Sequence, residues 1–462
     1  MNKPLTSDYF RFARPPVNAA RWVIAYSGGL DSTALLKLCV DYRDQHRPYL
    51  PLLALHVNHG LVPQADQWQA HCASVCESLG VPFSARKVTI RARPRRSTEQ
   101  LAREARYQCF RELLETEDLL LLAHHQDDQA ETMLYRLVRG SGALGLRSMV
   151  PFAESGGLLL WRPLLSVTRA ELEDFVGRQG LPWIEDSSNQ DQTFDRNFIR
   201  HQVMPLLAGR WPAVSHTLGR AARLAGESAQ LNDTLAAMDL EPIREPVTPH
   251  RLPMAQLQSL DDLRLKNALR YWFRQQGASL PSEQIMYQIL VAVRDYHSGQ
   301  NTLIEWPGAP VHSGSQEAEI RWQCRTFQQA LWLVQSTPEP DPGWWARLTT
   351  DSPTDLPASL GRLRLRQGGD REDGSLLNPE CLSEPLTVRF RQGGERFQPV
   401  MRPAKALKKW LNEWQVPPWE RRRMPLVFCG ETLVWVPGRG VAEGFQLTGE
   451  KAAAGLGILW EK

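Results

Sequence analysis

The strongest chemical pattern in this sequence is the run Ser27-Gly-Gly-Leu-Asp-Ser32, which follows an apolar, β-rich segment and precedes one with helical periodicity. Adjacent glycines let the backbone turn tightly and direct successive N–H groups into one concavity, which binds an anion at the start of a helix. The two serines add hydroxyl donors, and Asp31 offers a hard oxygen for Mg²⁺ on bound phosphates. The run therefore predicts a phosphate-binding loop, although the same letters also occur in simple helix-capping turns.

Two other phosphate-binding motifs differ from this run. No GxxxxGK[ST] sequence occurs, which excludes a Walker-type loop that hands on a γ-phosphate. Gly140-Ser-Gly-Ala-Leu-Gly145 spells GxGxxG, but it follows a helical pattern rather than a strand and lacks the βαβ setting of a dinucleotide site. We expect a flexible loop there.

A second polar group lies at residues 124–131. Asp128 and Glu131 are three residues apart, so on a helix both carboxylates face the same way. A solvated acidic helix face is the usual explanation of such a pair. Here, however, His124 and His125 stand directly before the helix, so the pair is predicted to bind a cationic substrate.

The elements around these residues alternate between strand and helix patterns, which is typical of a doubly wound parallel α/β sheet. The periodic segments between the strands begin near Ser32, Pro63 and Ser97. The expected strands are Trp22–Tyr26, Leu52–Val57, Pro82–Ile90 and Asp118–Ala123. Ligands bind beyond the carboxyl ends of such strands. The polar residues predicted at that edge are His56, Asn58, His59, His124 and His125.

The remainder of the chain changes character twice. From about Trp211 the pattern is helical, as in 218–238 and 260–276, and the Pro-rich stretch 337–343 reads as a linker. Behind it, residues 362–371 are nearly repeated at 388–396 as strand followed by turn. We therefore predict three domains: 1–212 catalytic, 213–336 mostly helical, and 345–462 small and α+β.

Composition narrows the protein class. Of 462 residues, 42% are hydrophobic and 23% charged, and no apolar run approaches the roughly 18 residues of a membrane span. The N-terminal residues lack the apolar region of a signal peptide, so a cytoplasmic location is expected. The seven Cys form no CxxC pair and are predicted to be reduced core thiols, Cys72 and Cys76 included.

Net charge is only +3, but basic residues cluster in two stretches. Residues 86–106 carry eight Arg or Lys against two Glu, and residues 389–423 carry ten against three. The second stretch is interleaved with Phe390, Phe397, Trp410, Trp414 and Trp419. Solvated surfaces remain the competing explanation, but two such stretches favour contact with a nucleic acid.

The motifs together resemble a known family. The run at 27–32 resembles the PP-loop of N-type ATP pyrophosphatases, which cleave ATP between the α- and β-phosphates and adenylate an oxygen of the substrate. Its neighbours are similar to the tRNA(Ile)-lysidine synthetase family, in order and spacing over most of residues 20–205. They are LHVNHGL (55–61), EQLAREARY (99–107), LAHHQDDQAET (122–132), RGSGALGL (139–146), RPLL (162–165), EDSSN (185–189) and DRNFIR (195–200). GGER (393–396), LKK (407–409) and RMPL (423–426) resemble that family's C-terminal tRNA-binding domain.

The resemblance implies the substrates and the roles of individual residues. The implied substrates are ATP with Mg²⁺, L-lysine and the isoleucine tRNA with a CAU anticodon. For ATP the implied contacts are Ser27, Gly28, Gly29, Leu30, Asp31, Ser32 and Arg106, with Asp31 also holding the metal. Asp128 and Glu131 would hold lysine, and the catalytic set would be Asp31, His124 and Asp128. The implied tRNA contacts are Arg196, Arg200, Lys405, Lys408 and Lys409, and the domains at 213–336 and 345–462 would both bind tRNA.

Several alternatives stay open at this stage. Arg196 and Arg200 could instead belong to a buried arginine network that closes the first domain. A tRNA thiolase of the same superfamily is the closest rival activity, but such enzymes commonly need CxxC or cluster-binding thiols. A PP-loop amide ligase would need an ammonia source, and a nucleotide-binding RNA chaperone would lack catalysis.

Overall fold

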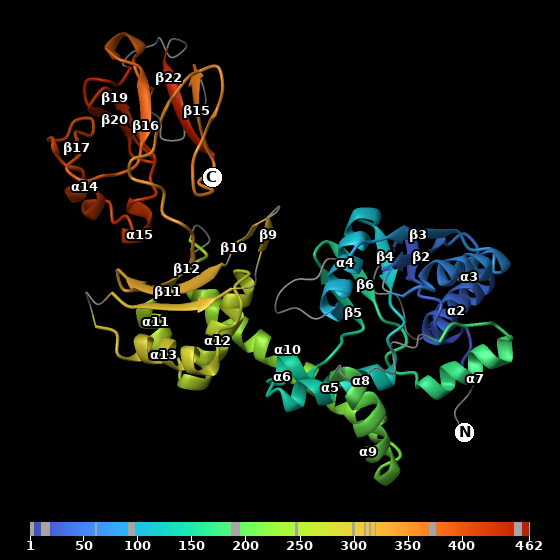
Figure 1. Ribbon diagram of the computed structural model, residues 1–462. Coiled ribbons are helices and arrows are strands. Elements are labelled where there is room, and N and C mark those ends of the chain that lie inside the picture. Colours follow the sequence, from blue (N-terminus) through green and yellow to red (C-terminus); the bar gives the residue numbers. More distant parts are fainter. Residues whose placement is uncertain are drawn as a thin grey trace. The chain divides into compact units, whose positions relative to one another are not determined.

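The computed structural model describes residues 4–10, 19–60, 62–90, 98–185, 195–244, 248–297, 301–308, 311–313, 316–318, 320–368, 376–447 and 455–461. The chain divides into two compact units, Met1–Thr234 and Leu235–Lys462, and each is described by itself (Figure 1). No helix within the described ranges is long and apolar enough to cross a membrane.

The first unit is built on a six-stranded sheet with the order β3-β2-β1-β4-β6-β5. All neighbouring strands are parallel except β5, which runs antiparallel to β6 at one edge. The strands are β1 (Arg21–Ala25), β2 (Leu52–Asn58), β3 (Phe83–Lys87), β4 (Asp118–Leu121), β5 (Phe152–Ser155) and β6 (Leu158–Trp161). The four strands expected from the sequence are confirmed: β1 is shifted by one residue, β2 is one residue longer, and β3 and β4 are shorter than expected.

Helices cover both faces of this sheet. Trp22 and Ile24 of β1 pack into one core with residues of α2, α3 and α7, whereas Val23 packs into a second core with Phe110 of α4. The doubly wound fold is therefore confirmed. The helices of this unit are α2 (Leu30–His46), α3 (Ala65–Ser78), α4 (Thr98–Leu113), α5 (Gln126–Val138), α6 (Ala143–Leu146), α7 (Arg169–Gln179), α8 (Asp195–Phe198), the π-helical η2 (Ile199–Val203), α9 (Met204–Arg210) and α10 (Val214–Leu240).

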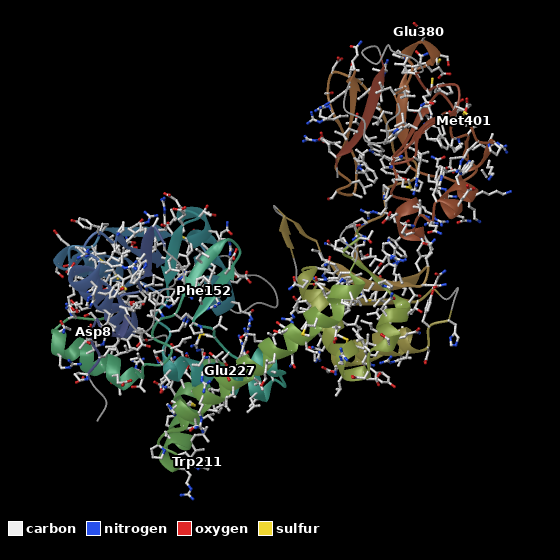
Figure 2. All side chains as sticks on the ribbon, turned by 180° about the vertical axis from the view of Figure 1, so that it is seen from behind. Asp8, Phe152, Trp211, Glu227, Glu380 and Met401 are labelled. Carbon is white, nitrogen blue, oxygen red and sulfur yellow. The ribbon has the colours of Figure 1, made fainter. Side chains whose placement is uncertain are left out.

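Two segments of this unit differ from expectation or lie outside the description. The GxGxxG run was expected to be a loop, but residues 143–146 form the single helical turn α6 after Gly142. Of the motif at 185–189, only Glu185 is described. The change to helical pattern near Trp211 coincides with the turn between α9 and α10, where the Trp211 side chain points outward (Figure 2).

The second unit begins with a helical region that also contains a sheet. One core is shared by the helices η3 (Glu241–Ile243), α11 (Met254–Ser259), α12 (Asp262–Gln275) and α13 (Glu283–Arg294), and α12 contributes the buried Trp272 and Phe273 to it. An antiparallel sheet of order β7-β12-β11-β8 completes this core, which the sequence analysis did not predict. Its strands are β7 (Arg251–Pro253), β8 (Leu303–Pro307), β11 (Arg321–Phe327) and β12 (Ala330–Ser336), beside the hairpin β9 (Val311–Ser313) and β10 (Gln316–Ala318).

The C-terminal region is β-rich with short helices, as expected. Its sheets have the orders β13-β16-β19-β20-β21, β14-β15-β22 and β17-β18. The strands are β13 (Trp345–Arg347), β14 (Thr354–Asp355), β15 (Arg362–Gln367), β16 (Leu386–Arg389), β17 (Arg396–Phe397), β18 (Lys405–Ala406), β19 (Leu426–Cys429), β20 (Thr432–Val436), β21 (Gly440–Val441) and β22 (Leu456–Glu461). The helices are η4 (Pro379–Cys381), α14 (Leu407–Glu413) and α15 (Pro418–Arg421). Both copies of the near-repeat begin as strands, β15 and β16.

Candidate active site

The phosphate loop connects β1 to α2, in the strand–loop–helix setting that the sequence predicted. Gly28 has φ +84°, and a Cβ there would lie 2.7 Å from Cys72 Sγ and 3.0 Å from Ile184 Cδ1. The Ile184 amide donates a hydrogen bond of 2.9 Å to the Gly28 carbonyl. Only glycine fits this position without displacing a neighbour, because both the backbone conformation and the space exclude a side chain.

The side chains of the loop leave one oxygen without a partner. Ser32 Oγ donates to the Gly29 carbonyl at 3.0 Å and lies 3.0 Å from Ser27 Oγ. Asp31 Oδ1 is buried and has no hydrogen-bond partner. Burial raises the pKa of Asp31, whereas the charge of His125 opposes that rise. An orphaned carboxylate oxygen beside backbone amides fits a cation bound to phosphates. The Leu30 side chain is buried in the core, so only its backbone can face a ligand.

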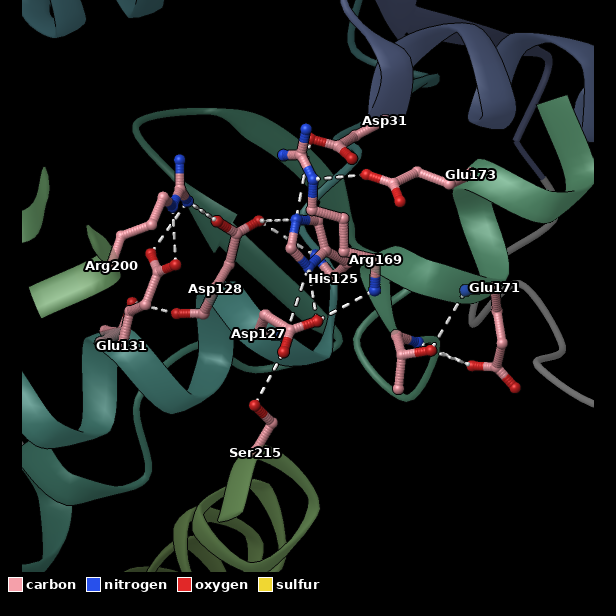
Figure 3. Close-up of polar contacts among 12 residues, drawn as sticks. Asp31, His125, Asp127, Asp128, Glu131, Arg169, Glu171, Glu173, Arg200 and Ser215 are labelled. Atoms are coloured by element: carbon pink, nitrogen blue, oxygen red, sulfur yellow. Dashed lines mark hydrogen bonds and ion pairs between the residues drawn. The ribbon is translucent and has the colours of Figure 1, made fainter. Parts of the chain in front are cut away.

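Helix α5 begins with a capping box that positions the polar cluster. His125 Nδ1 accepts from the Asp127 amide at 3.2 Å, and Asp128 Oδ2 accepts from the His125 amide at 3.1 Å. The other ring nitrogen, Nε2, lies 3.7 Å from Asp31 Oδ2 and 3.5 Å from Asp128 Oδ2 (Figure 3). His125 thus connects the phosphate loop to the acidic helix. Burial alone would lower its pKa, but Asp127, Asp128 and Asp31 more than offset burial and raise it.

His124 has a different environment. Its Nδ1 is buried without a hydrogen-bond partner. Burial lowers the pKa of His124 to about 3; the charge of Asp128 opposes this, and the charge of Arg162 adds to it. The imidazole is therefore neutral near pH 7 and can exchange hydrogen bonds with a ligand, but it is a weak base in this state.

The acidic pair of α5 is engaged by two arginines. Arg196 and Arg200 each donate from Nη2 to Asp128 Oδ1 at 2.8 Å. Arg200 also forms a fork with Glu131, from Nε to Oε1 at 2.7 Å and from Nη2 to Oε2 at 2.9 Å (Figure 3). Burial alone would raise the pKa of Asp128, but His125 and the arginines lower it to about 2. The arginine network, one of the two alternatives for Arg196 and Arg200, is present.

Two residues at the site were missed by the sequence analysis. Asp127 accepts from Ser215 Oγ of α10 at 2.7 Å and from the Arg169 amide of α7 at 2.9 Å, so it ties three helices together. Buried Arg162 donates to the Val150 carbonyl at 2.9 Å, while its Nε has no partner. Asp127 stands beside the assigned Asp128, and Arg162 begins the RPLL motif, but the contacts that define their roles come from distant segments.

Three other residues that the sequence singled out, Arg106, His59 and His56, lie on or beside α4 and β2. Arg106 of α4 is half-buried. The pKa of His59 is lowered to about 4, mainly by burial and further by the positive charge of Arg106. His56 Nδ1 lies 2.9 Å from the Tyr26 carbonyl, so this ring is already engaged by the backbone. Among the described residues, no group of three or more His, Cys, Asp or Glu could hold a metal ion by itself.

The aromatic and basic residues of the C-terminal stretch 389–423 lie in different environments. Phe390, Phe397 and Trp410 are buried in cores and cannot stack on RNA bases. Lys405 Nζ lies 3.2 Å from Glu413 Oε2 and 4.4 Å from the Trp410 ring centre. Lys408 and Lys409 are exposed on α14. Of the three lysines predicted to contact tRNA, Lys408 and Lys409 are the exposed ones.

The chain matches three family models along its length. A PP-loop domain covers residues 1–207, a TilS substrate binding domain covers 252–332, and a TilS substrate C-terminal domain covers 386–460. A solved structure of the U34-tRNA thiolase NcsA from Methanococcus maripaludis is similar at 17% identity and a TM-score of 0.41, covering 48% of this chain and 78% of that one. This structural similarity is too low to carry an argument.

Curated proteins match this chain over nearly its whole length. The tRNA(Ile)-lysidine synthase of Coxiella burnetii is 36% identical over 446 residues, which cover 96% of this chain and 94% of that protein. The enzyme of the same name from Pseudomonas fluorescens is 38% identical over 451 residues, covering 96% and 95%. Identity of this extent, together with the phosphate loop and the polar cluster at the edge of the sheet, shows that the chain belongs to the tRNA(Ile)-lysidine synthase family.

Proposed function

We propose that this protein forms lysidine in the isoleucine tRNA with a CAU anticodon. ATP first adenylates the wobble cytidine, and lysine then replaces the AMP, which changes codon reading from AUG to AUA. The observation that carries the proposal is the short link between the two halves of the site. His125 lies 3.7 Å from Asp31 of the phosphate loop and 3.5 Å from Asp128 of the acidic pair. A nucleotide and a cationic co-substrate would therefore meet at one edge of the sheet.

In the first step, the C2 carbonyl oxygen of cytosine attacks the α-phosphorus of ATP and pyrophosphate leaves. The backbone amides of residues 28–30 and the hydroxyls of Ser27 and Ser32 hold the phosphates, with Arg106 near the nucleotide or the reacting carbonyl. Asp31 would hold Mg²⁺, which would neutralise charge on the phosphates. The unpartnered Oδ1 of Asp31 fits this role.

In the second step, the ε-amine of lysine attacks C2 and the bond to the AMP oxygen breaks. Asp128 and Glu131 hold the cationic lysine, since two buried carboxylates on one helical turn offer it compensating charge. The amine must lose a proton before it attacks. Asp128 and His124 are the candidates to take it; because the pKa of each is lowered here, we expect the transfer to depend on a rise of that pKa when the substrates bind. His124, buried and neutral, also contacts ATP or the reacting base.

The tRNA is held at two places. Arg196 and Arg200 contact its backbone next to the reacting base, and Lys405, Lys408 and Lys409 contact it in the C-terminal region. Since Lys405 is already paired with Glu413, Lys408 and Lys409 carry most of this second contact. We place the reaction in the cytoplasm.

The alternative activity, thiolation of a tRNA base, is not favoured. All seven Cys are unpaired, and six of them are buried. Burial raises the pKa of Cys72 and Cys76 to about 12, so neither thiol is activated.

The proposal is tested by product analysis. The protein is incubated with ATP, isotopically labelled lysine and the isoleucine tRNA, and the tRNA is digested and analysed by mass spectrometry. We expect one cytidine to gain the labelled lysine, with equal amounts of AMP and pyrophosphate formed. A sulfur-containing nucleoside, or no change in the tRNA, would contradict the proposal.

A further inference from the structure

The lysine site proposed above is closed by the chain's own arginines. Asp128 Oδ1 accepts from both Arg196 and Arg200, and both oxygens of Glu131 accept from Arg200. Figure 3 shows Arg200 lying against both carboxylates. Two carboxylates and two guanidinium groups carry no net charge together. An incoming ammonium group therefore finds no uncompensated negative charge there.

The four side chains cannot serve both of their proposed ligands in this arrangement. A carboxylate oxygen already bound by guanidinium donors offers little to lysine, and a guanidinium group used by a carboxylate offers little to a phosphate. Nε and Nη2 of Arg196 and Arg200 can bind RNA phosphates only if these atoms leave Asp128 and Glu131. The same movement would expose two negative charges to lysine.

We propose that Arg196 and Arg200 determine when lysine can bind: they occupy Asp128 and Glu131 until the phosphates of the tRNA draw them away. This inference rests on the proposed function. Lysine is thereby kept from the nucleotide until the base to be modified is present, and the two substrates bind cooperatively.

Burial and hydrogen bonding indicate which half of the cluster moves. The carboxylate side chains are only 10% and 3% exposed for Asp128 and Glu131, whereas Arg196 and Arg200 are 35% and 25% exposed. Asp128 is also held through Oδ2 by the His125 amide. Both arginines come from the short α8–η2 segment and are four residues apart, so one face of that segment carries both. Phosphates can reach the arginines from solvent while the carboxylates stay in place.

The size of the effect follows from thermodynamic linkage. Coupling between two ligands typically changes affinity by about 5–150-fold, and each ligand must change the affinity of the other by the same factor. We expect a factor in this range between tRNA and lysine.

The experiment measures binding of radiolabelled lysine to the full chain by equilibrium dialysis, with and without the isoleucine tRNA. An ATP analogue that cannot be cleaved between the α- and β-phosphates is present throughout. In the wild type, tRNA should raise the lysine affinity, and saturating lysine should raise the tRNA affinity by the same factor. Equal lysine affinity in both states would overturn the proposal without any variant.

Variants identify the arginines as the cause. Arg200→Gln and Arg196→Gln should raise the lysine affinity measured without tRNA, so the effect of tRNA shrinks toward one. The control Arg178→Gln breaks an exposed ion pair with Asp174 on α7 and should keep the wild-type dependence on tRNA. Loss of lysine binding in Arg200→Gln would show that the arginine holds lysine itself, which overturns the proposal.

Failure of the proposed function gives a different result. If neither the wild type nor any variant binds lysine, with or without tRNA, the lysine site is wrongly assigned and both proposals fall. If lysine binds the wild type with the same affinity with and without tRNA, only the coupling falls.

Discussion

Gly28→Ala tests whether the phosphate loop is built as described. The new Cβ would lie 2.7 Å from Cys72 Sγ and 3.0 Å from Ile184 Cδ1, at a φ of +84°. A left-handed φ costs an L-residue about 1–2 kcal/mol. Overpacking a buried position costs about 1–3 kcal/mol more. We therefore expect the free energy of unfolding of the first unit to fall by about 2–5 kcal/mol.

The assay is calorimetric melting of the full chain, in which the transition of the first unit is the one that ATP raises. For a unit of this size, a loss of about 2–5 kcal/mol lowers Tm by roughly 4–20 °C. Cys72→Ala removes the closest atom but leaves φ unchanged. Alanine at 28 should therefore lose only part of the packing cost of about 1–3 kcal/mol in that background, because Ile184 Cδ1 stays in place.

A matched control is available on α7. Gly177 is a helical glycine whose Cβ would meet nothing within 4 Å, so Gly177→Ala should be neutral or stabilise the unit by about 0.5–1 kcal/mol. An unchanged melting temperature in Gly28→Ala, or the same loss with and without Cys72, would refute the packing argument for this loop.

Three further predictions concern the metal ligand, acid stability and the C-terminal lysines. Asp31→Ala should keep the fold but abolish AMP formation, because the oxygen left for Mg²⁺ is lost; AMP release at the wild-type rate would contradict the site. The pKa of His124 is about 3 in the folded protein and about 6.5 in the unfolded chain. The stability that this group contributes above pH 6.5 should therefore be lost as the pH falls toward 3. Thermal melts recorded against pH should show a smaller loss in His124→Gln. Lys408→Ala with Lys409→Ala should reduce the log–log salt slope of tRNA binding by about 0.7–0.9 per contact, while Lys405→Ala should change it less; an unaltered slope in the double variant would remove α14 from the tRNA contact.

The sequence was most informative where function depends on neighbouring residues. The loop at 27–32, its flanking strand and helix, and the spacing of Asp128 and Glu131 are local features, and local patterns predict them directly. The edge at which the polar residues meet followed from the rule that ligands bind beyond the carboxyl ends of parallel strands.

Contacts between distant segments were not predictable in the same way. Arg196 lies 68 residues after Asp128, and Ser215 lies 88 residues after Asp127, so no spacing rule links them. The burial of Phe390, Phe397 and Trp410 was not predictable either, because the sequence gives the type of these residues but not the cores into which they pack. The sheet in the middle region was missed because short strands among amphipathic helices have a weak periodic signal.

The central claim is that the acidic pair of α5 binds lysine beside the nucleotide loop. Steady-state kinetics of Glu131→Gln test it most directly, with Asp174→Asn, an exposed carboxylate of α7, as the control. Loss of one charged partner of a cation corresponds to about 1.5–3 kcal/mol, so the lysine KM should rise about 10–150-fold while the ATP KM stays nearly constant. Equal increases in both KM values, or none in either, would contradict the claim.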